Sequence, residues 1–257
     1  MVKNIPPKLY KFQTFNKYSI QNLKRGQIWF SKPEKLNDPF DCAIPFILDW
    51  TDKDFETFYL QLQGKDNFAT PTKSFYVTDG KPNQKFQDIT RKTHEYYMRL
   101  KIINQISGMG ISCFTENLDN ILMWSHYADS HKAFCIEFDT NYSPFLDAEK
   151  LHQVIYSNKY PSLSPVAFFQ GGYMPIDILI TKSIWWKYEN EWRQIIDIGN
   201  MPVEYDPRAL TAIYFGCSMP DKQMRQIAAI LAKSATPLFK MQRSHKDYGL
   251  VPIPYKA

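Results

Sequence analysis

Apolar residues recur along the chain with two different spacings, which predicts a mixture of strands and helices. Runs of alternating or continuous apolar residues predict strands at 9–14, 27–31, 111–114, 133–138, 153–156, 192–196, 210–215 and 237–242. Spacings of three and four residues predict a short helix over 19–24 that ends at Gly26. The same spacing predicts a helix over about 220–234 with Ser218 as its N-cap. We therefore expect an α+β protein with small mixed or antiparallel sheets.

The segment 51–107 has a helical pattern that differs from the strand-rich remainder. Thr51 is followed three residues later by an aspartate, a pair typical of a capping box. Residues 86–106 carry the longest helical pattern in the chain. The stretch 64–84 is polar and aperiodic and predicts a long surface connection. We therefore expect one domain over 1–257 with a helical insertion at 51–107.

Composition places the chain among ordinary folded proteins. Hydrophobic residues make up 44% and charged residues 22% of the 257 residues. The aromatic content of 16% indicates either a ring-rich core or rings that contact a planar ligand. A net charge of +5 allows a weak attraction to polyanions but is no evidence of nucleic-acid binding.

Cysteine spacing and hydropathy favour a protein of the cytoplasm. The four cysteines lie far apart and form no Cys-x-x-Cys pair, which predicts reduced and mostly buried thiols. They are Cys42, Cys113, Cys135 and Cys217. The first eight residues lack the apolar stretch of a signal peptide, and no run of about 18 apolar residues occurs. We therefore expect a cytoplasmic protein without a membrane partner.

A first group of candidate ligand-binding side chains lies in a turn after the second predicted strand. Asn37, Asp38 and Asp41 gather around Pro39, which stiffens the chain and holds polar groups at a fixed angle. The alternative is structural: Asn37 and Asp38 satisfy the backbone donors of the turn while Phe40 fills the core.

A second group lies between two predicted strands. Trp124, His126, Tyr127 and His131 combine rings that stack with groups that exchange or share protons. On a helix, His126 and Tyr127 would share a face with Met123. The alternative makes Trp124 and Tyr127 core aromatics and His126 a satisfied, half-buried residue. The His-x4-His spacing lacks a zinc motif's glutamate, so these histidines do not indicate a metal site.

A third group precedes and enters a predicted strand. In an extended chain, Glu189, Glu191 and Arg193 project to one side. Carboxyls that are buried together can have different pKa values, which suits acid/base work or the holding of ribose hydroxyls. The alternative is an ordinary ion pair of either glutamate with Arg193 at a sheet edge.

These segments resemble a bacterial and phage family catalogued as domain of unknown function 2971. The similar blocks are 9–12, 28–33, 36–41, 112–139 and 188–193. They leave out the helical insertion, and one departure is Ala133, where the family usually has glycine. Members often occur near mobile elements and defence genes, so the resemblance implies a toxin-type or antiphage effector.

A looser resemblance links the same order of residues to ADP-ribosyltransferases, which bind NAD in a cleft of a split β core. It implies that Lys11 is the anchor on the first strand and that Ser112 and Thr115 are the hydroxyls of a middle strand. Glu189 and Glu191 would take the paired-glutamate position. Lysine stands where these enzymes have arginine or histidine, and a lysine lacks the bidentate face of a guanidinium.

The resemblance implies an effector that acts on NAD and transfers ADP-ribose to a nucleic-acid or protein acceptor or to water. Glu191 would stabilise the charge that develops on ribose, while Tyr127 or Trp124 stacks on nicotinamide. The expected catalytic residues are Glu191, Glu189, Ser112, Tyr127 and His126. The residues expected to bind this small-molecule nucleotide are Lys11, Asn37, Asp38, Phe40, Thr115, Trp124 and Arg193.

Two other functions stay open from the sequence. In the first, Asp38, Asp41, Glu189 and Glu191 hold a divalent metal for cleavage of a nucleic acid. In the second, the same residues recognise a small ligand or a phage component without turnover. A requirement for added magnesium or manganese separates the first from the NAD reaction. The acceptor and the oligomeric state stay open too.

Overall fold

An eight-stranded mixed sheet forms the centre of the computed structural model, which describes residues 4–42, 46–63, 77–79, 81–166 and 176–256. The strand order is β16-β15-β14-β7-β1-β6-β12-β8. Its strands are β1 (Lys8–Gln13), β6 (Gly110–Thr115), β7 (Phe134–Asp139), β8 (Leu151–Gln153), β12 (Glu191–Ile196), β14 (Leu210–Phe215), β15 (Leu238–Arg243) and β16 (Leu250–Pro254). β14 and β15 run parallel, and the other neighbours in this sheet are antiparallel.

Four two-stranded sheets surround the main sheet. They are β2 (Gln27–Phe30) with β13 (Met201–Glu204), β3 (Ile47–Leu48) with β10 (Ser162–Leu163), β9 (Ile155–Ser157) with β11 (Thr181–Ser183), and β4 (Val77–Thr78) with β5 (Lys81–Pro82). Ser31, next to β2, forms an isolated bridge with Ile111 of β6, which joins this small sheet to the large one.

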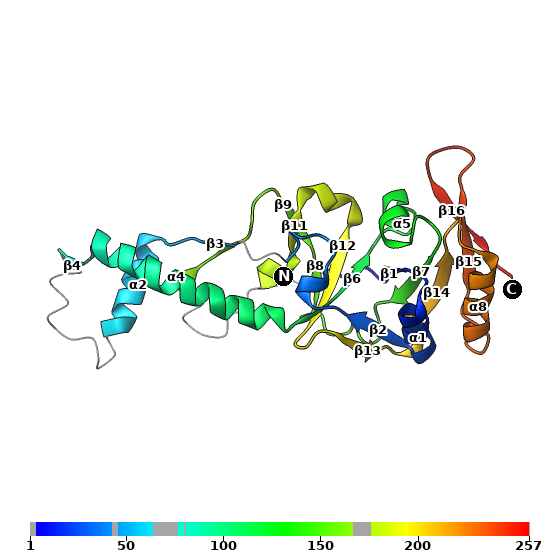
Figure 1. Ribbon diagram of the computed structural model, residues 1–257, viewed down its shortest axis with the longest axis horizontal. Helices are drawn as coiled ribbons and strands as arrows, with labels where there is room; N and C mark the ends of the chain where they lie inside the picture. Colours follow the sequence, from blue (N-terminus) through cyan, green and yellow to red (C-terminus); the bar gives the residue numbers. More distant parts are fainter. Residues whose placement is uncertain (1–3, 43–45, 64–76, 80, 167–175, 257) are drawn as a thin grey trace.

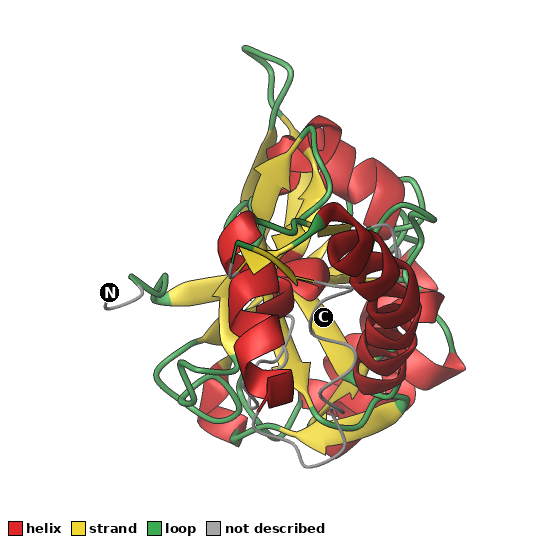
Figure 2. Cartoon of the chain, turned by 90° about the vertical axis from the view of Figure 1, so that its left-hand side faces the viewer, coloured by secondary structure: helices red, strands yellow, loops and turns green. Residues whose placement is uncertain are grey.

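Helices gather at both ends of the molecule. The α-helices are α1 (Lys17–Arg25), α2 (Asp52–Gln63), α4 (Gln84–Ser107), α5 (Ile121–Tyr127), α7 (Ile176–Ile180) and α8 (Asp221–Leu231). The 3-10 helices are η1 (Pro33–Lys35), η3 (Ile184–Glu189) and η4 (Pro207–Ala209). In Figure 1, α2 and α4 extend to one side of the sheet, and α1 and α8 lie toward the opposite end. Figure 2 looks along the molecule from the α2 end, with helices in front of the strands. No described helix is long and apolar enough to cross a membrane.

Apolar clusters cover both faces of the main sheet. Because successive strand residues point to opposite faces, Phe134 and Ile136 join one cluster while Cys135, between them, joins another. On β12, Trp192 packs into the first of these clusters. Its neighbours Glu191 and Arg193 therefore point to the opposite face, where they are also buried.

The α+β class predicted from the pattern is confirmed, although the main sheet is larger than the small sheets that we expected. The predicted strand 153–156 is wrong in extent: it is divided between β8, which pairs with β12, and β9, which pairs with β11. β13 and β16 were not predicted, because each contains prolines that cannot donate to a ladder. Both are edge strands, so one side of each has no neighbouring strand among the described residues that needs a backbone donor.

The predicted helix boundaries are mostly confirmed. Thr51 and Asp54 form the expected reciprocal cap of α2, with Thr51 N donating to Asp54 Oδ2 at 2.8 Å and Asp54 N to Thr51 Oγ1 at 3.2 Å. Ser218 does not cap α8; Pro220 is the N-cap, and Ser218 N donates to His131 O at 3.0 Å. Of the predicted connection 64–84, residues 64–76 and 80 lie outside the described part of the chain. All four cysteines are free thiols, buried or half-buried.

Candidate functional site

Arg193 connects the turn formed by residues 37–41 to the centre of β12. Its side chain is 0% exposed. Nη1 and Nη2 donate to the two carboxylate oxygens of Asp41 at 2.8 and 2.6 Å, and Nε donates to Glu191 Oε1 at 2.8 Å. Nη1 also donates to Leu179 O at 2.7 Å. Only the planar fork of arginine offers donors in this geometry, so the residue orients Asp41 and Glu191 together.

Lys182, on β11, lies where three carboxylates converge. Its Nζ forms ion pairs with Glu189 and with Glu191 Oε2, the latter at 3.0 Å. Asp41 Oδ2 is 3.7 Å from the same nitrogen. The ammonium is buried, as are the three acids. Burying these charges is tolerable only because the two signs lie in direct contact.

Tyr127 adds a phenol to this cluster from α5. Its hydroxyl donates to Glu189 Oε1 at 2.6 Å, and Asn37 Nδ2 lies 3.4 Å from the same hydroxyl. Asn120 begins α5 by accepting from Leu122 N at 2.9 Å, and its Nδ2 donates to Tyr188 O at 2.8 Å. One side chain therefore caps α5 and binds it to the segment that carries Glu189.

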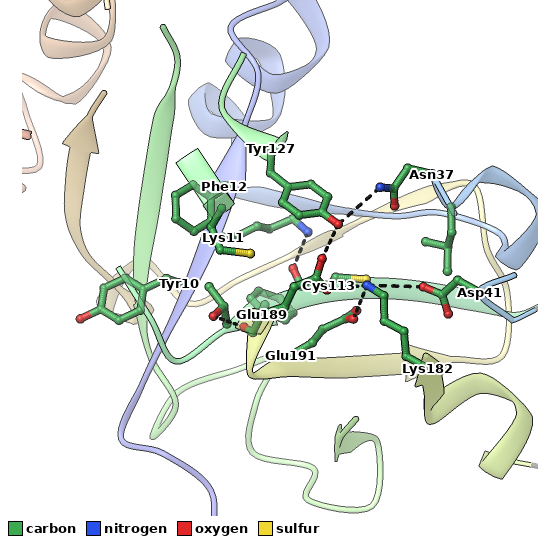
Figure 3. A pocket seen from close by; sticks show the side chains of 14 residues that line it. Tyr10, Lys11, Phe12, Asn37, Asp41, Cys113, Tyr127, Lys182, Glu189 and Glu191 are labelled. Atoms are coloured by element: carbon green, nitrogen blue, oxygen red, sulfur yellow. Dashed lines mark hydrogen bonds and ion pairs between the residues drawn. The ribbon is translucent and has the colours of Figure 1, made fainter. Parts of the chain in front are cut away.

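These side chains form one wall of a cavity of about 150 Å³. Tyr127, Lys182 and Glu189 face a common space together with Asn37 (Figure 3). Lys11 of β1 also lines the cavity, and its Nζ donates to Ser112 Oγ at 2.8 Å and to Cys113 O at 3.1 Å. The cavity lining thus combines acids, a phenol and two lysines, Lys11 and Lys182.

The two neighbouring glutamates have opposite pKa shifts. Burial raises the pKa of Glu189, against the attraction of Lys182. Burial opposes ionisation of Glu191 too, but Arg193 and Lys182 outweigh it and hold its pKa well below the usual range. Burial raises the pKa of Tyr127. Glu191 is therefore an anion, whereas the pKa of Glu189 lies closer to the neutral range.

Burial also lowers the pKa of Lys11, which has no carboxylate at hydrogen-bonding distance among the described residues. Its Nζ lies 5.0 Å from the centre of the Phe114 ring. Lys182 behaves differently: burial opposes its charge, but Glu191 and Glu189 raise its pKa. Lys182 is therefore committed to the acids, while Lys11 pairs with a hydroxyl and a carbonyl oxygen.

The structure brings together about half of the site residues predicted from the sequence. Those that line the cavity are Lys11, Asn37, Thr115, Tyr127, Glu189 and Glu191. The hydroxyl of Thr115 donates to Glu189 O and accepts from Asn117 N at 3.0 Å, so it positions backbone. Ser112 is buried behind Lys11 and does not line the cavity, contrary to its predicted catalytic place. Arg193 is also behind the wall and supports Glu191 rather than a ligand.

Four predicted residues lie away from the cavity. Trp124 is sealed in the core, where its Nε1 donates to Leu118 O at 2.6 Å, so it cannot stack on a ligand there. His126 is exposed and pairs with Tyr188 Oη at 3.0 Å. Asp38 and Phe40 lie on the other side of their turn, beside a second cavity. Phe40 does not fill the core either, because it is 67% exposed.

Sequence reasoning missed Lys182 and did not give Asp41 its place beside Arg193. The signal for Lys182 was a single charge within the apolar run 178–186. Its ammonium occupies the point where Asp41, Glu189 and Glu191 meet, so a divalent cation there would have to displace it. Within the described residues, no group of three or more His, Cys, Asp or Glu side chains is arranged to hold a metal. The metal-dependent alternative therefore finds no matching donor set in this part of the chain.

Comparison with known proteins gives one match. No curated protein and no solved structure matches the chain. A family model described as "Protein of unknown function (DUF2971)" matches residues 123–194, a span that contains Tyr127, Lys182, Glu189 and Glu191. The segment from α5 to β12 is therefore similar to the DUF2971 family.

Proposed function

We propose that this protein cleaves the bond between ribose and nicotinamide in NAD, and transfers the ADP-ribosyl group to a macromolecule or to water. One arrangement supports the proposal: Glu189 and Glu191 share Lys182 at a cavity wall, with pKa values displaced in opposite directions. An ionised and a protonatable carboxylate side by side are the groups that glycosidic chemistry uses.

The roles of the two acids follow from their surroundings. As the bond from ribose C1′ to the pyridinium nitrogen breaks, its electron pair neutralises that nitrogen and positive charge develops on the ribose. Glu191, held as an anion by Arg193, stabilises that charge. A hydroxyl of the acceptor or of water then bonds to C1′ and gives its proton to Glu189. The raised pKa of Glu189 suits a base that works near neutral pH.

The remaining cavity residues position the substrate. Of the two aromatic residues expected to stack on nicotinamide, Tyr127 lines the cavity and Trp124 is buried in the core. We therefore give the stacking role to Tyr127. Lys11 lines the same cavity and serves as the anchor for the ribose and its phosphate. A cavity of about 150 Å³ is smaller than a usual ligand pocket, so we place only the reacting end of NAD in it. The role of a defence or toxin-type effector rests on the resemblance to DUF2971 members alone, and the cytoplasmic location on the cysteine spacing and hydropathy.

Release of nicotinamide tests the reaction. Purified protein is incubated with NAD, with and without cell extract, and free nicotinamide is followed by chromatography. We expect Glu189→Gln to lower the rate by about 100-fold or more, because a positioned base contributes that much. Tyr127→Ala should also lower the rate, because it removes the stacking ring. Glu189→Gln keeps the shape of the buried side chain, so loss of folding is not expected.

Glu137→Gln is the matched control. Glu137 is a buried acid on β7 that accepts from Tyr214 Oη at 2.8 Å and pairs with Lys8 at 2.8 Å, which repeats the surroundings of Glu189 outside the cavity. Its substitution should leave the rate unchanged. Equal release by wild type and Glu189→Gln would contradict the reaction. Binding of NAD without release would instead support the non-catalytic sensor.

A further inference from the structure

A second and larger cavity, of about 470 Å³, adjoins the first. Its walls come from the turn 37–41, from the end of β9 and the loop after it, and from β11 with η3. Lys182 borders both cavities. The two are therefore separate spaces with one residue in common.

Large aromatic side chains surround this cavity without being buried. Phe40 is 67%, Tyr160 43% and Trp185 84% exposed. Leaving large rings in water forgoes the free energy of burial, and exposed apolar groups gathered around one hollow are typical of a binding site. A ring that enters the cavity would cover them.

Local hydrogen bonds hold the walls of this cavity in place. Asp38 Oδ1 accepts from Phe40 N at 2.9 Å, and the next residue, Asp41, is bound by Arg193. On another wall, Ser157 Oγ accepts from Lys159 N at 2.9 Å and donates to Lys159 O at 2.9 Å. The cavity is therefore shaped before a ligand arrives, which lowers the entropic cost of binding.

Polar groups accompany the rings. Ser157 and Asn158 line the cavity beside the aromatic side chains, and Thr181 and Ser183 line it from β11. Lys159 adds a positive charge to the same wall. Rings for a planar face, hydroxyl and amide groups for a polar edge and an ammonium for an anion together match a nucleobase that carries a phosphate.

We propose that this second cavity binds an unpaired nucleobase with its phosphate, by stacking on Trp185 and Phe40. The ligand is a free nucleotide or a base of a single-stranded nucleic acid, which share this chemistry. The site does not depend on the reaction proposed above. Lys182, whose ammonium holds both glutamates, lines this cavity as well, so the second cavity is also placed to affect the first.

Calorimetric titration of the full-length protein tests this site. The probes are AMP, ribose 5-phosphate, a short single-stranded DNA and the corresponding duplex. We expect AMP or the single strand to bind, and ribose 5-phosphate and the duplex to bind at least tenfold more weakly, because both lack an accessible base. Binding of AMP alone assigns the site to free nucleotides, and tighter binding of the single strand assigns it to nucleic acid.

Variants place the binding in the second cavity. Trp185→Ala should weaken binding by about tenfold or more, since a stacked base contributes on that order. Trp29→Ala is the matched control, because Trp29 is an exposed tryptophan of β2, 42% exposed, outside both cavities. Equal affinity for ribose 5-phosphate, no binding of either base-containing probe, or unchanged affinity of Trp185→Ala would each overturn the proposal.

Discussion

Glu189 and Glu191 are close in sequence, yet their carboxyl groups meet different surroundings. Glu191 contacts two cations, Arg193 and Lys182, which together overcome its burial. Glu189 contacts Lys182 and the phenol of Tyr127, and burial dominates its pKa. The number of cations in contact therefore decides the direction in which the pKa of each acid is shifted.

This difference predicts a pH-dependent effect of Glu189→Gln on stability. A pKa raised in the folded state means that Glu189 stabilises the fold below the pKa of an ordinary glutamate, about 4.3. That contribution is lost as the pH rises through the raised value. Glutamine does not titrate. The free energy of unfolding of the variant, relative to that of wild type, should therefore increase as the pH rises above about 4.3. Urea unfolding at a series of pH values measures this difference.

Glu137→Gln provides the opposite sign. Burial opposes ionisation of Glu137, but hydrogen bonds from Lys8, Thr211 and Tyr214 lower its pKa. Its stabilising contribution is present above the ordinary glutamate pKa. The free energy of unfolding of this variant, relative to that of wild type, should therefore decrease as the pH rises. A Glu189→Gln difference that stays constant or shrinks with rising pH would mean that Lys182 keeps Glu189 ionised.

At the scale of elements, α5 and η3 deliver Tyr127 and Glu189 to the same place. Asn120 joins these elements through its cap of α5 and its hydrogen bond to Tyr188 O. A short helix such as α5 has little stability of its own in water. Its position, and with it the position of the phenol, depends on this connection.

Asn120→Ala should therefore affect both stability and the site. Loss of the cap and of the hydrogen bond should cost about 1–2 kcal/mol of unfolding free energy. Release of nicotinamide should also fall, because Tyr127 loses its fixed position relative to Glu189. The control is Asn16→Ala, which removes the cap of α1. The Asn16 side chain accepts from Tyr18 N at 2.9 Å and from Ser19 N at 3.0 Å. Asn16→Ala should lower stability alone, and equal rates for both variants would exclude a positioning role of Asn120.

At the scale of the whole molecule, α4 supports the sheet face that carries the acids. Ile102 of α4 lies in one apolar cluster with Leu179 and Ile195. Leu179 O accepts from Arg193, so this cluster borders the buried charges. Figure 1 shows α4 reaching from the sheet toward α2. The helical segment is thus part of the core that keeps water from the ion pairs.

Ile102→Ala tests this support. The substitution should cost about 2–5 kcal/mol, as expected for a fully buried isoleucine. Leu100→Ala, on the same helix but 41% exposed, should change stability by about 0.5 kcal/mol or less. Urea unfolding followed by circular dichroism measures both values. Similar small costs for the two variants would mean that α4 does not take part in the core.

Elements with strong local patterns could be predicted from the sequence because neighbouring residues determine them. The strand at 210–215 and the cap between Thr51 and Asp54 are confirmed in this way. The division of 153–156 into β8 and β9 could not be predicted, since it depends on which strands pair with each half. The burial of Trp124 and the exposure of Phe40 could not be predicted either, because packing against distant segments decides both.

The sequence by itself determined the α+β class, most elements and three segments with chemically active side chains. Only the tertiary structure decided that Lys182 lies among the carboxylates, because its partners Asp41, Glu189 and Glu191 come from other segments. It also decided which acid has a raised pKa and which a lowered one, since a pKa depends on burial and on charges brought close by folding. Local pattern depends on neighbours in the chain, whereas the electrostatics of a site depend on neighbours in space.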